Sequence, residues 1–469
     1  MKYREYTVSY LTSSRYLALW FYLVLLFQSI QSSEASLSQT TVKTIVGSPP
    51  HLSLPLEMNM DDLDLFGLKV YNQNYYGEEV DHLPLMSNYP FKDKVAIAPM
   101  KYPNENEFHD ADGDELIGFE ANGNIKMEWF YTNSKNKLVS FVPKDNDTFC
   151  SLAKKNINAP FKVKLTADSL LLVTTHGHPD YFVYPNDDVT TPPSKTYTIM
   201  DDVGICYAKP EIKPKESKAN GISQWDRDNG FLPQSRNDPS KNFPTTGFYG
   251  ARFQLILTNA QLAKDYEWSV KQGGELVQVN KDDKTQDVTV SFDMPDAKDP
   301  AKAWQYIMGS DDGYTVIVEG KNPQKNTTIQ YSFTLVKWFT GWDENKIGEP
   351  GASVTTGPKV DESCSALAGG GKYRISYTNE VVNSSLQAAK AKYTREIGTL
   401  FSEWGDPSQK AYPNSWAAND KQDLRHKRIW LYDPDQKKYC DLHTYQAVYH
   451  CVAESDLKNG LCTAVAEYN

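Results

Sequence analysis

Three aspartates at alternate positions are the clearest candidates for metal chemistry in this chain. Asp110, Asp112 and Asp114 occur in the sequence Asp-Ala-Asp-Gly-Asp, a spacing typical of calcium loops because calcium takes several carboxylate oxygens at once. An EF-hand would need glycine at the sixth position and glutamate at the twelfth, where this chain has Glu115 and Ala121. The alternatives are a calcium loop of another kind and a solvated acidic turn.

Two histidines separated by one residue form a second candidate set of metal ligands. His176 and His178 could chelate an ion, with His109 as a third ligand from another segment. A catalytic zinc ion usually has three protein ligands, and no spacing in this sequence identifies the third one. Since Pro179 and Asp180 follow directly, a surface turn is the simpler interpretation.

The cysteines are even in number, and none belongs to a Cys-x-x-Cys pair, which disfavours a thiolate zinc site or a redox motif. In an oxidising compartment all of them would form disulfides. Cys150 and Cys206 lie apart from the others and are predicted to pair with each other. The remaining cysteines lie towards the C-terminus: Cys364, Cys440, Cys451 and Cys462.

Aromatic and basic side chains occur together late in the sequence and could form a binding surface for another protein. Trp416, Trp430 and Tyr432 lie near a basic run that begins at Arg425 and ends at Arg428. Exposed aromatic and arginine side chains dominate the energetics of protein interfaces. The alternative is that the tryptophans belong to the core, an interpretation that we favour for Trp430.

Motifs of the common enzyme classes are missing from the sequence. It contains no Gly-x-Ser-x-Gly elbow, no His-Glu-x-x-His helix and no phosphate-binding glycine loop. The formal net charge of -11 disfavours nucleic acid as a partner, because a phosphate-binding fold needs a basic face. We therefore expect a protein that is not an enzyme and needs no cofactor.

Residues 1–35 are predicted to be a signal peptide. Lys2 and Arg4 precede an apolar run from Tyr16 to Phe27, and small and polar residues follow it. This run is short for a bilayer span, which takes about 20 residues, but it suits the core of a signal peptide. An uncleaved membrane anchor is the alternative. We expect an exported chain, on the bacterial cell surface or extracellular, without an integral membrane segment once the signal is removed.

Hydrophobic patterning predicts a mainly β protein of several domains. Short runs rich in Val, Ile, Tyr and Thr recur along the chain, and such residues pack well on pleated, half-buried surfaces. The predicted layout is a β-rich N-terminal module over 51–215, a linker over 216–244, a β-sandwich over 245–340, a second linker over 341–363 and an α+β domain over 364–469.

Individual strands and one helix can be placed by periodicity. Apolar residues Ile397, Leu400, Phe401 and Trp404 fall at helical spacing, and Gly405 follows as a stop signal. The predicted strands are 126–131, 138–142, 161–165, 169–174 and 181–184 in the module, 251–257, 266–270, 288–292, 314–319 and 329–335 in the sandwich, and 428–432 and 446–452 near the C-terminus.

Two segments resemble the tips of intimin and invasin, which are enterobacterial adhesins. The first runs from Thr246-Gly-Phe-Tyr-Gly through Asp265-Tyr-Glu-Trp to Tyr331-Ser-Phe-Thr-Leu, and is similar to the bacterial immunoglobulin-like (Ig-like) domain that precedes their receptor-binding domain. The second contains Cys364, Arg395-Glu-Ile-Gly-Thr-Leu-Phe-Ser-Glu-Trp and Tyr449-His-Cys-Val, and resembles their C-type-lectin-like domain. More loosely, the N-terminal half resembles RatA-type adhesins.

The resemblance implies an adhesin that binds a host or cell-surface protein or glycan receptor without covalent chemistry. It also implies that Cys364 pairs with Cys451, which leaves Cys440 for Cys462. The competing arrangement joins Cys364 to Cys462 and Cys440 to Cys451. Two other functions stay open: a secreted glycan-acting hydrolase with an accessory binding module, and a structural component of the envelope.

A lectin-like domain raises the question of calcium-dependent sugar binding. Such sites use a tripeptide with a carboxylate or amide before Pro-Asn or Pro-Asp, together with Trp-Asn-Asp. The chain offers Tyr412-Pro-Asn-Ser-Trp and Ala418-Asn-Asp, in which the acidic residue before the Pro-Asn pair is missing. A protein-binding surface is therefore the favoured interpretation.

Overall fold

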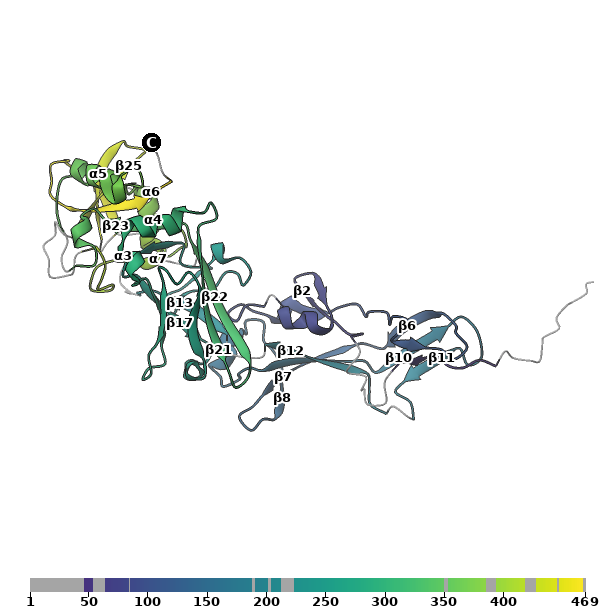
Figure 1. Cartoon of the computed structure of the whole chain (residues 1–469). Helices are drawn as coiled ribbons and strands as arrows, with labels where there is room; N and C mark the ends of the chain where they lie inside the picture. The colour runs from purple at the N-terminus through teal and green to yellow at the C-terminus, as the bar shows by residue number, and fades with distance from the viewer. Residues whose placement is uncertain are drawn as a thin grey trace, which may run out of the picture.

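A computed structural model describes most of the chain, and it is mainly β with several domains. The described residues are 46–53, 64–83, 85–187, 190–200, 204–211, 223–349, 353–384, 394–417, 427–444 and 447–466. An N-terminal module, a sandwich domain and a C-terminal domain follow one another along an elongated molecule (Figure 1). The predicted signal peptide, residues 1–35, lies outside the described residues. No helix in the described part of the chain has the length and apolar character needed to cross a membrane.

The N-terminal module is built from four small sheets, in the orders β1-β5, β3-β2-β4, β11-β10-β6 and β12-β9-β7-β8. Its elements are β1 His51–Leu52, β2 Leu68–Val70, β3 Gln73–Tyr75, η2 Gly77–His82, η3 Lys92–Lys94, β4 Val95–Ile97, β5 Phe108–His109, β6 Leu116–Asn122, β7 Lys126–Thr132, β8 Leu138–Phe141, α2 Phe149–Ala153, β9 Phe161–Thr166, β10 Ser169–Thr174, β11 Tyr181–Tyr184 and β12 Ser194–Met200.

Alternation of apolar residues explains these strands. In β9, Phe161, Val163 and Leu165 are buried while the lysines between them are only partly covered, as the period of two in a strand requires. Phe91 stacks on Phe149 at a centroid distance of 4.3 Å and joins the core of the module. All the predicted strands of the module are found, and β10 and β11 have the predicted bounds.

The sandwich domain consists of a six-stranded sheet, in the order β14-β15-β13-β17-β20-β19, and a three-stranded sheet, in the order β18-β21-β22. Its elements are β13 Ile205–Lys209, β14 Trp225–Asp226, β15 Gly230–Phe231, η4 Pro239–Lys241, β17 Arg252–Leu257, η5 Ala260–Asp265, β18 Glu267–Gln272, β19 Gln278–Lys281, β20 Val288–Ser291, α3 Pro295–Lys298, α4 Pro300–Met308, β21 Tyr314–Asn322 and β22 Thr327–Leu335.

The sandwich begins earlier in the chain than predicted. Strand β13 lies within the range assigned to the N-terminal module, yet Ala208 pairs with Leu255 of β17. The expected linker over 216–244 carries β14 and β15, and its Phe231 and Phe243 are fully buried. These boundaries are corrected accordingly. Aromatic residues set among polar ones show no period, which is why the pattern suggested a linker.

The C-terminal domain has a seven-stranded sheet, in the order β16-β23-β28-β25-β26-β27, with β24 also paired to β28. Its elements are β16 Thr246–Phe248, β23 Lys337–Gly341, η6 Glu344–Lys346, α5 Gly357–Ala366, η7 Leu367–Gly369, β24 Tyr373–Ile375, α6 Thr378–Val381, α7 Leu400–Trp404, β25 Arg428–Asp433, β26 Lys438–His443, β27 Val448–Cys451 and β28 Asn459–Ala464.

Two predictions for this domain need correction. The expected linker over 341–363 contains the start of α5, and its first residue is the last residue of β23, so the domain begins well before Cys364. The predicted helix begins at Leu400 rather than at Ile397, because Gly398, at φ 131°, has no helical conformation. Helix α7 ends as predicted at Gly405, which takes a φ of 73°.

The structure contains three disulfides. Cys150 pairs with Cys206, as predicted. Cys364 of α5 pairs with Cys462 of β28, and Cys440 pairs with Cys451, which lies directly opposite in the sheet. The pairing implied by the resemblance, Cys364 with Cys451, is therefore wrong, and the competing arrangement is found. The physical reason is that α5 packs on β28 and not on the edge strand β27.

A buried carboxylate joins the sandwich domain to the C-terminal domain. Glu403 of α7 is 0 % exposed and accepts bonds from the backbone N–H and hydroxyl groups of Thr245 and Thr246, at 2.5–2.9 Å. The N–H of Gly398 donates to it as well, at 3.0 Å. Burial raises the pKa of the Glu403 carboxyl, and the bonds from the two threonines oppose this rise. The joint thus has a satisfied polar centre.

Aromatic rings surround this polar centre. Trp404 lies next to Glu403 and contacts rings from both sides of the joint, including Phe243 at 5.0 Å, Phe292 at 5.8 Å and Tyr412 at 5.9 Å between centroids. Its indole N–H donates to Thr246. The sandwich and C-terminal domains consequently share one continuous hydrophobic core.

The two disulfides of the C-terminal domain should differ in their contribution to stability. Their cysteines are 98 and 11 residues apart. The chain-entropy relation therefore gives about 4.7 kcal/mol for Cys364–Cys462 and about 2.7 kcal/mol for Cys440–Cys451. Replacing the first pair by serine should lower the denaturant midpoint more than replacing the second. Peptide mapping without reduction checks the pairing itself, and a Cys364–Cys451 peptide would contradict the structure.

Removal of the Glu403 carboxylate should destabilise the joint. Glu403→Ala leaves the buried donors of Thr245 and Thr246 without an acceptor, and we expect a loss of about 3–5 kcal/mol in the free energy of unfolding. Glu403→Gln turns an amide group towards two donors but keeps the shape and one acceptor oxygen, so its loss should be smaller than that of Glu403→Ala. Glu396→Ala, at an exposed position nearby, is the control and should leave stability almost unchanged. Calorimetry of the full chain measures all three.

Candidate functional site

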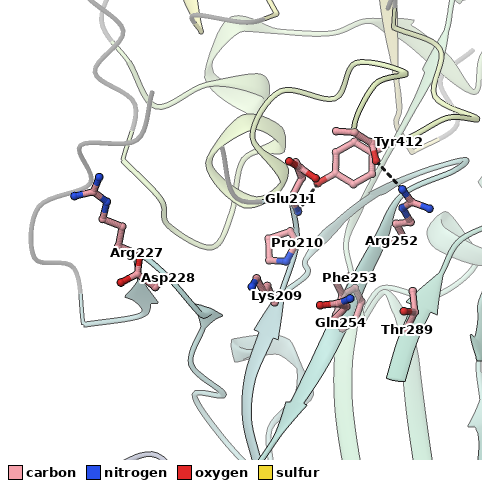
Figure 2. A pocket seen from close by; sticks show the side chains of 11 residues that line it. Lys209, Pro210, Glu211, Arg227, Asp228, Arg252, Phe253, Gln254, Thr289 and Tyr412 are labelled. Atoms are coloured by element: carbon pink, nitrogen blue, oxygen red, sulfur yellow. Dashed lines mark hydrogen bonds between the residues drawn. The ribbon is translucent and has the colours of Figure 1, made fainter. Parts of the chain in front are cut away.

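A hollow of about 650 Å³ lies where the six-stranded sheet of the sandwich meets the C-terminal domain. Figure 2 shows Lys209 at the end of β13, Glu211 just after it, Arg252 on β17, and Tyr412 beside Glu211. Arg227 and Asp228, from the turn between β14 and β15, line it as well. Both charge signs are therefore present, with three cationic and two anionic side chains.

Many polar groups that line this hollow already form hydrogen bonds between the sandwich domain and the C-terminal domain. The Glu211 N–H donates to the Tyr412 hydroxyl at 3.1 Å, and that hydroxyl donates to the Trp404 carbonyl at 2.8 Å. Arg252 donates to the Ala411 carbonyl at 3.2 Å. Burial raises the pKa of Tyr412, so it stays a neutral donor. The lining is suited to holding a polar molecule, and no lining residue is arranged as a nucleophile beside a base.

A smaller hollow of about 380 Å³ lies on the C-terminal domain itself. Arg374 forms its base, with the guanidinium 3.4 Å from the centre of the Tyr377 ring and two bonds of 3.0 and 2.7 Å to Glu380. The rest of the lining consists of Asp361, Ser365, Ile375 and Tyr432. Aromatic faces beside an oriented arginine and a carboxylate are the elements from which recognition surfaces are built.

The hydrogen bonds around this hollow fix its side chains. The Tyr439 hydroxyl donates to Asp361 at 2.9 Å, and burial, followed by this bond, raises the pKa of Tyr439. The Tyr432 ring lies between those of Tyr377 and Tyr439, at centroid distances of 5.9 and 5.5 Å. The surface is therefore ordered before any partner arrives, which lowers the entropy cost of binding.

The predicted receptor-binding residues do not form one exposed surface. Trp416 is 5 % exposed and Trp430 is 0 % exposed, so the prediction that they serve as exposed anchors is wrong. Trp430 donates to the Thr355 carbonyl at 3.0 Å, and apolar packing on both faces of the sheet explains its burial. The alternative that the tryptophans belong to the core is confirmed.

The other predicted contact residues have different surroundings. Arg428 is partly exposed and pairs with the buried Asp441 at 2.7 Å, so its charge is already partnered. Arg425 lies outside the described residues. Tyr432 lines the smaller hollow, together with Arg374 and Tyr377. Arg374, Tyr377 and Asp361 were missed because they carry no motif and are distant in the sequence from Tyr432.

The candidate metal ligands are only partly brought together. Asp110, Asp112 and Asp114 each offer a carboxylate oxygen within 4.8 Å of the others. The Nδ1 atom of His176 lies 3.1 Å from Asp114. No group of three that could hold a metal includes a histidine among the described residues, so the set of His109, His176 and His178 is not assembled.

The sugar-binding candidates give no calcium site in the described residues. Tyr412 and Trp416 are buried, and the Asn414 amide donates to Asp293 at 3.3 Å. Residues 418–420 lie outside the described residues. Among the described residues, the other cluster whose spacing could suit a metal ion consists of Asp433, Cys440 and Cys451. Its two cysteines are joined to each other in a disulfide and are not free to bind a metal.

Comparison with known proteins gives one family match. Residues 234–333 match the family described as invasin, domain 4. The match spans most of the sandwich domain, including β16, which pairs into the C-terminal sheet. It supports an Ig-like domain of the invasin and intimin type, an adhesin-like function in general, and a bacterial protein exposed at the surface. No curated protein and no solved structure matches the chain.

The different burial of two neighbouring aromatic residues can be tested by truncation. Trp430→Ala should cost about 3–5 kcal/mol of stability, as removal of a fully buried tryptophan usually does. Tyr432→Ala, at a half-buried position lining a hollow, should cost less than half of that. Chemical denaturation of the two variants measures the difference, and equal losses would contradict the burial described here.

Proposed function

We propose that this chain is an exported bacterial adhesin that binds a host or cell-surface receptor through its C-terminal domain. Recognition would be non-covalent, with the sandwich domain holding the C-terminal domain at a distance from the bacterial surface. The observation that carries the proposal is the position of the invasin-domain match, directly beside and packed against the C-terminal domain.

The joint between the two domains supports this arrangement. The shared hydrophobic core and the bonds that Glu403 accepts leave little freedom for one domain to reorient on the other. A receptor-binding domain held in a fixed orientation loses less entropy when it binds. The elongated outline of the molecule, with the C-terminal domain at one end (Figure 1), fits the same role.

Within the C-terminal domain we place the recognition surface at the hollow lined by Tyr432, Tyr377, Arg374 and Asp361. We propose a C-type-lectin-like character for this domain, with protein rather than sugar as the main ligand. The support is the aromatic and arginine lining and the loss of Trp416 and Trp430 as exposed candidates. Aromatic and arginine side chains are enriched at the centres of protein interfaces.

Cell binding by the purified full chain tests the proposal. Tyr432→Ala should weaken binding to receptor-bearing cells by at least about tenfold, since central aromatic residues often contribute 2 kcal/mol or more. Tyr181→Ala, an exposed tyrosine of the N-terminal module, is the matched control and should bind as the unmodified chain does.

Two outcomes would contradict the proposal. One is the absence of saturable binding to any of a panel of host and bacterial cells, together with none to arrayed glycans and extracellular proteins. The other is normal binding by Tyr432→Ala accompanied by loss in Tyr181→Ala, which would transfer recognition to the N-terminal module.

A further inference from the structure

We propose that the loop containing Asp110, Asp112 and Asp114 in the N-terminal module is a calcium-binding site. The site is separate from the recognition surface, and nothing in the adhesin assignment requires it. The argument rests on the side-chain geometry of the loop, on one buried oxygen without a partner and on the segments that meet there.

The first observation is the close approach of three carboxylates. One oxygen from each of Asp110, Asp112 and Asp114 lies within 4.8 Å of the other two. Among the described residues, no lysine or arginine pairs with any of them, and the His176 ring lies 3.1 Å from Asp114. Like charges at this separation repel each other. A bound cation of charge two would convert this repulsion into attraction.

The second observation is an oxygen with no partner. Asp110 is only 7 % exposed, and its Oδ1 atom accepts from the N–H groups of Asp112 and Asp114 at 2.9 and 3.3 Å. These two hydrogen bonds hold the chain in the turn from Asp110 to Asp114. Its Oδ2 atom is buried and has no hydrogen-bond partner among the described residues. Because a buried carboxylate oxygen is rarely left unsatisfied, this atom marks where a ligand is expected.

The backbone of the loop is shaped to bring these oxygens together. Gly113 has a φ of 80° and open space where a Cβ would lie, so glycine is needed here for its conformation rather than for lack of room. This left-handed residue turns the chain between Asp112 and Asp114. The turn leaves all three carboxylates on one side of the loop, with their oxygens within reach of a single ion.

Three segments of the module meet at the loop. The Ser48 N–H donates to Asp112, the Gly47 N–H donates to the His178 carbonyl at 3.3 Å, and the Thr175 N–H donates to the Glu115 carbonyl at 3.1 Å. These contacts lie at the end of the module away from the C-terminal domain (Figure 1). An ion in the loop would therefore fasten the start of the described chain to the body of the module.

The donor set favours calcium over other divalent ions. All three side chains offer carboxylate oxygens, which suit hard cations and not zinc or copper, which favour nitrogen and sulfur. Calcium accepts six to eight oxygens with flexible geometry, so the protein carboxylates can be supplemented by water. Magnesium needs a stricter octahedral arrangement. His176 then serves to orient Asp114 from outside the coordination sphere.

Isothermal titration of CaCl2 into the full exported chain, freed of metal by a chelator, tests the site. We expect saturable binding of one calcium ion per chain. Asp110→Asn should weaken the affinity at least about tenfold, because affinity depends on the number of ligand charges. This variant keeps Oδ1 to cap the turn and replaces the orphaned oxygen by an amide group. Asp114→Asn provides a second variant should the first fold poorly.

A matched control is available in the sandwich domain. Asp282 also caps a turn through Oδ1, which accepts from Lys284 and Thr285 at 2.8 Å, and it is not part of a cluster of metal ligands among the described residues. Asp282→Asn should bind calcium as the unmodified chain does. Three results would overturn the proposal: no heat of binding up to millimolar calcium, equal affinity in Asp110→Asn, or tighter binding of magnesium than of calcium.

Discussion

The carboxylate of Glu403 is the constraint on which the arrangement of the two C-terminal domains depends. A charge with no solvent contact is tolerated only when nearly all of its acceptor positions are occupied. Two consecutive threonines provide four donors here and Gly398 a fifth. Those threonines stand where the chain enters β16, so the same contacts that satisfy the charge also fix the strand that crosses the joint. A buried polar group with a single satisfied geometry thus selects one relative placement of the two domains.

The aromatic shell makes that selection stable. Trp404 touches rings from both domains, and Tyr412 donates to its carbonyl. The larger hollow, shown in Figure 2, lies beside this shell, and several of its polar groups form hydrogen bonds between the two domains. The smaller hollow around Arg374 lies on the outside of the C-terminal domain and uses few such bonds. This difference is the structural reason for proposing the recognition surface at the smaller hollow and not at the larger one.

Features that depend on a few neighbouring residues could be predicted from the sequence, whereas features that depend on contacts between distant segments could not. Strands such as β9, β10 and β11 follow from alternation within a few residues, and the stop at Gly405 follows from a single glycine. The partner of Cys364 depends on which strand lies beneath α5, which no local pattern encodes. The same is true of Trp416, whose sequence neighbours are small or polar although the fold encloses it. The burial of Phe231 and Phe243 was missed because isolated aromatic residues in a Pro- and Asn-rich stretch show no periodicity that would predict a strand.

Strand β16 has a mechanical consequence. It pairs with β23 in the C-terminal sheet, although the whole succession from β17 to β22 intervenes between them in the chain. The sandwich is therefore joined to its neighbour by residues 249–251 before β17 and by Val336 alone after β22, in addition to the segment that leads from η4 into β16. A single connection would allow the two domains to rotate relative to each other, whereas these short neighbouring connections restrict that rotation. Tension applied to the C-terminal domain would therefore be transmitted to the sandwich and would not open the joint.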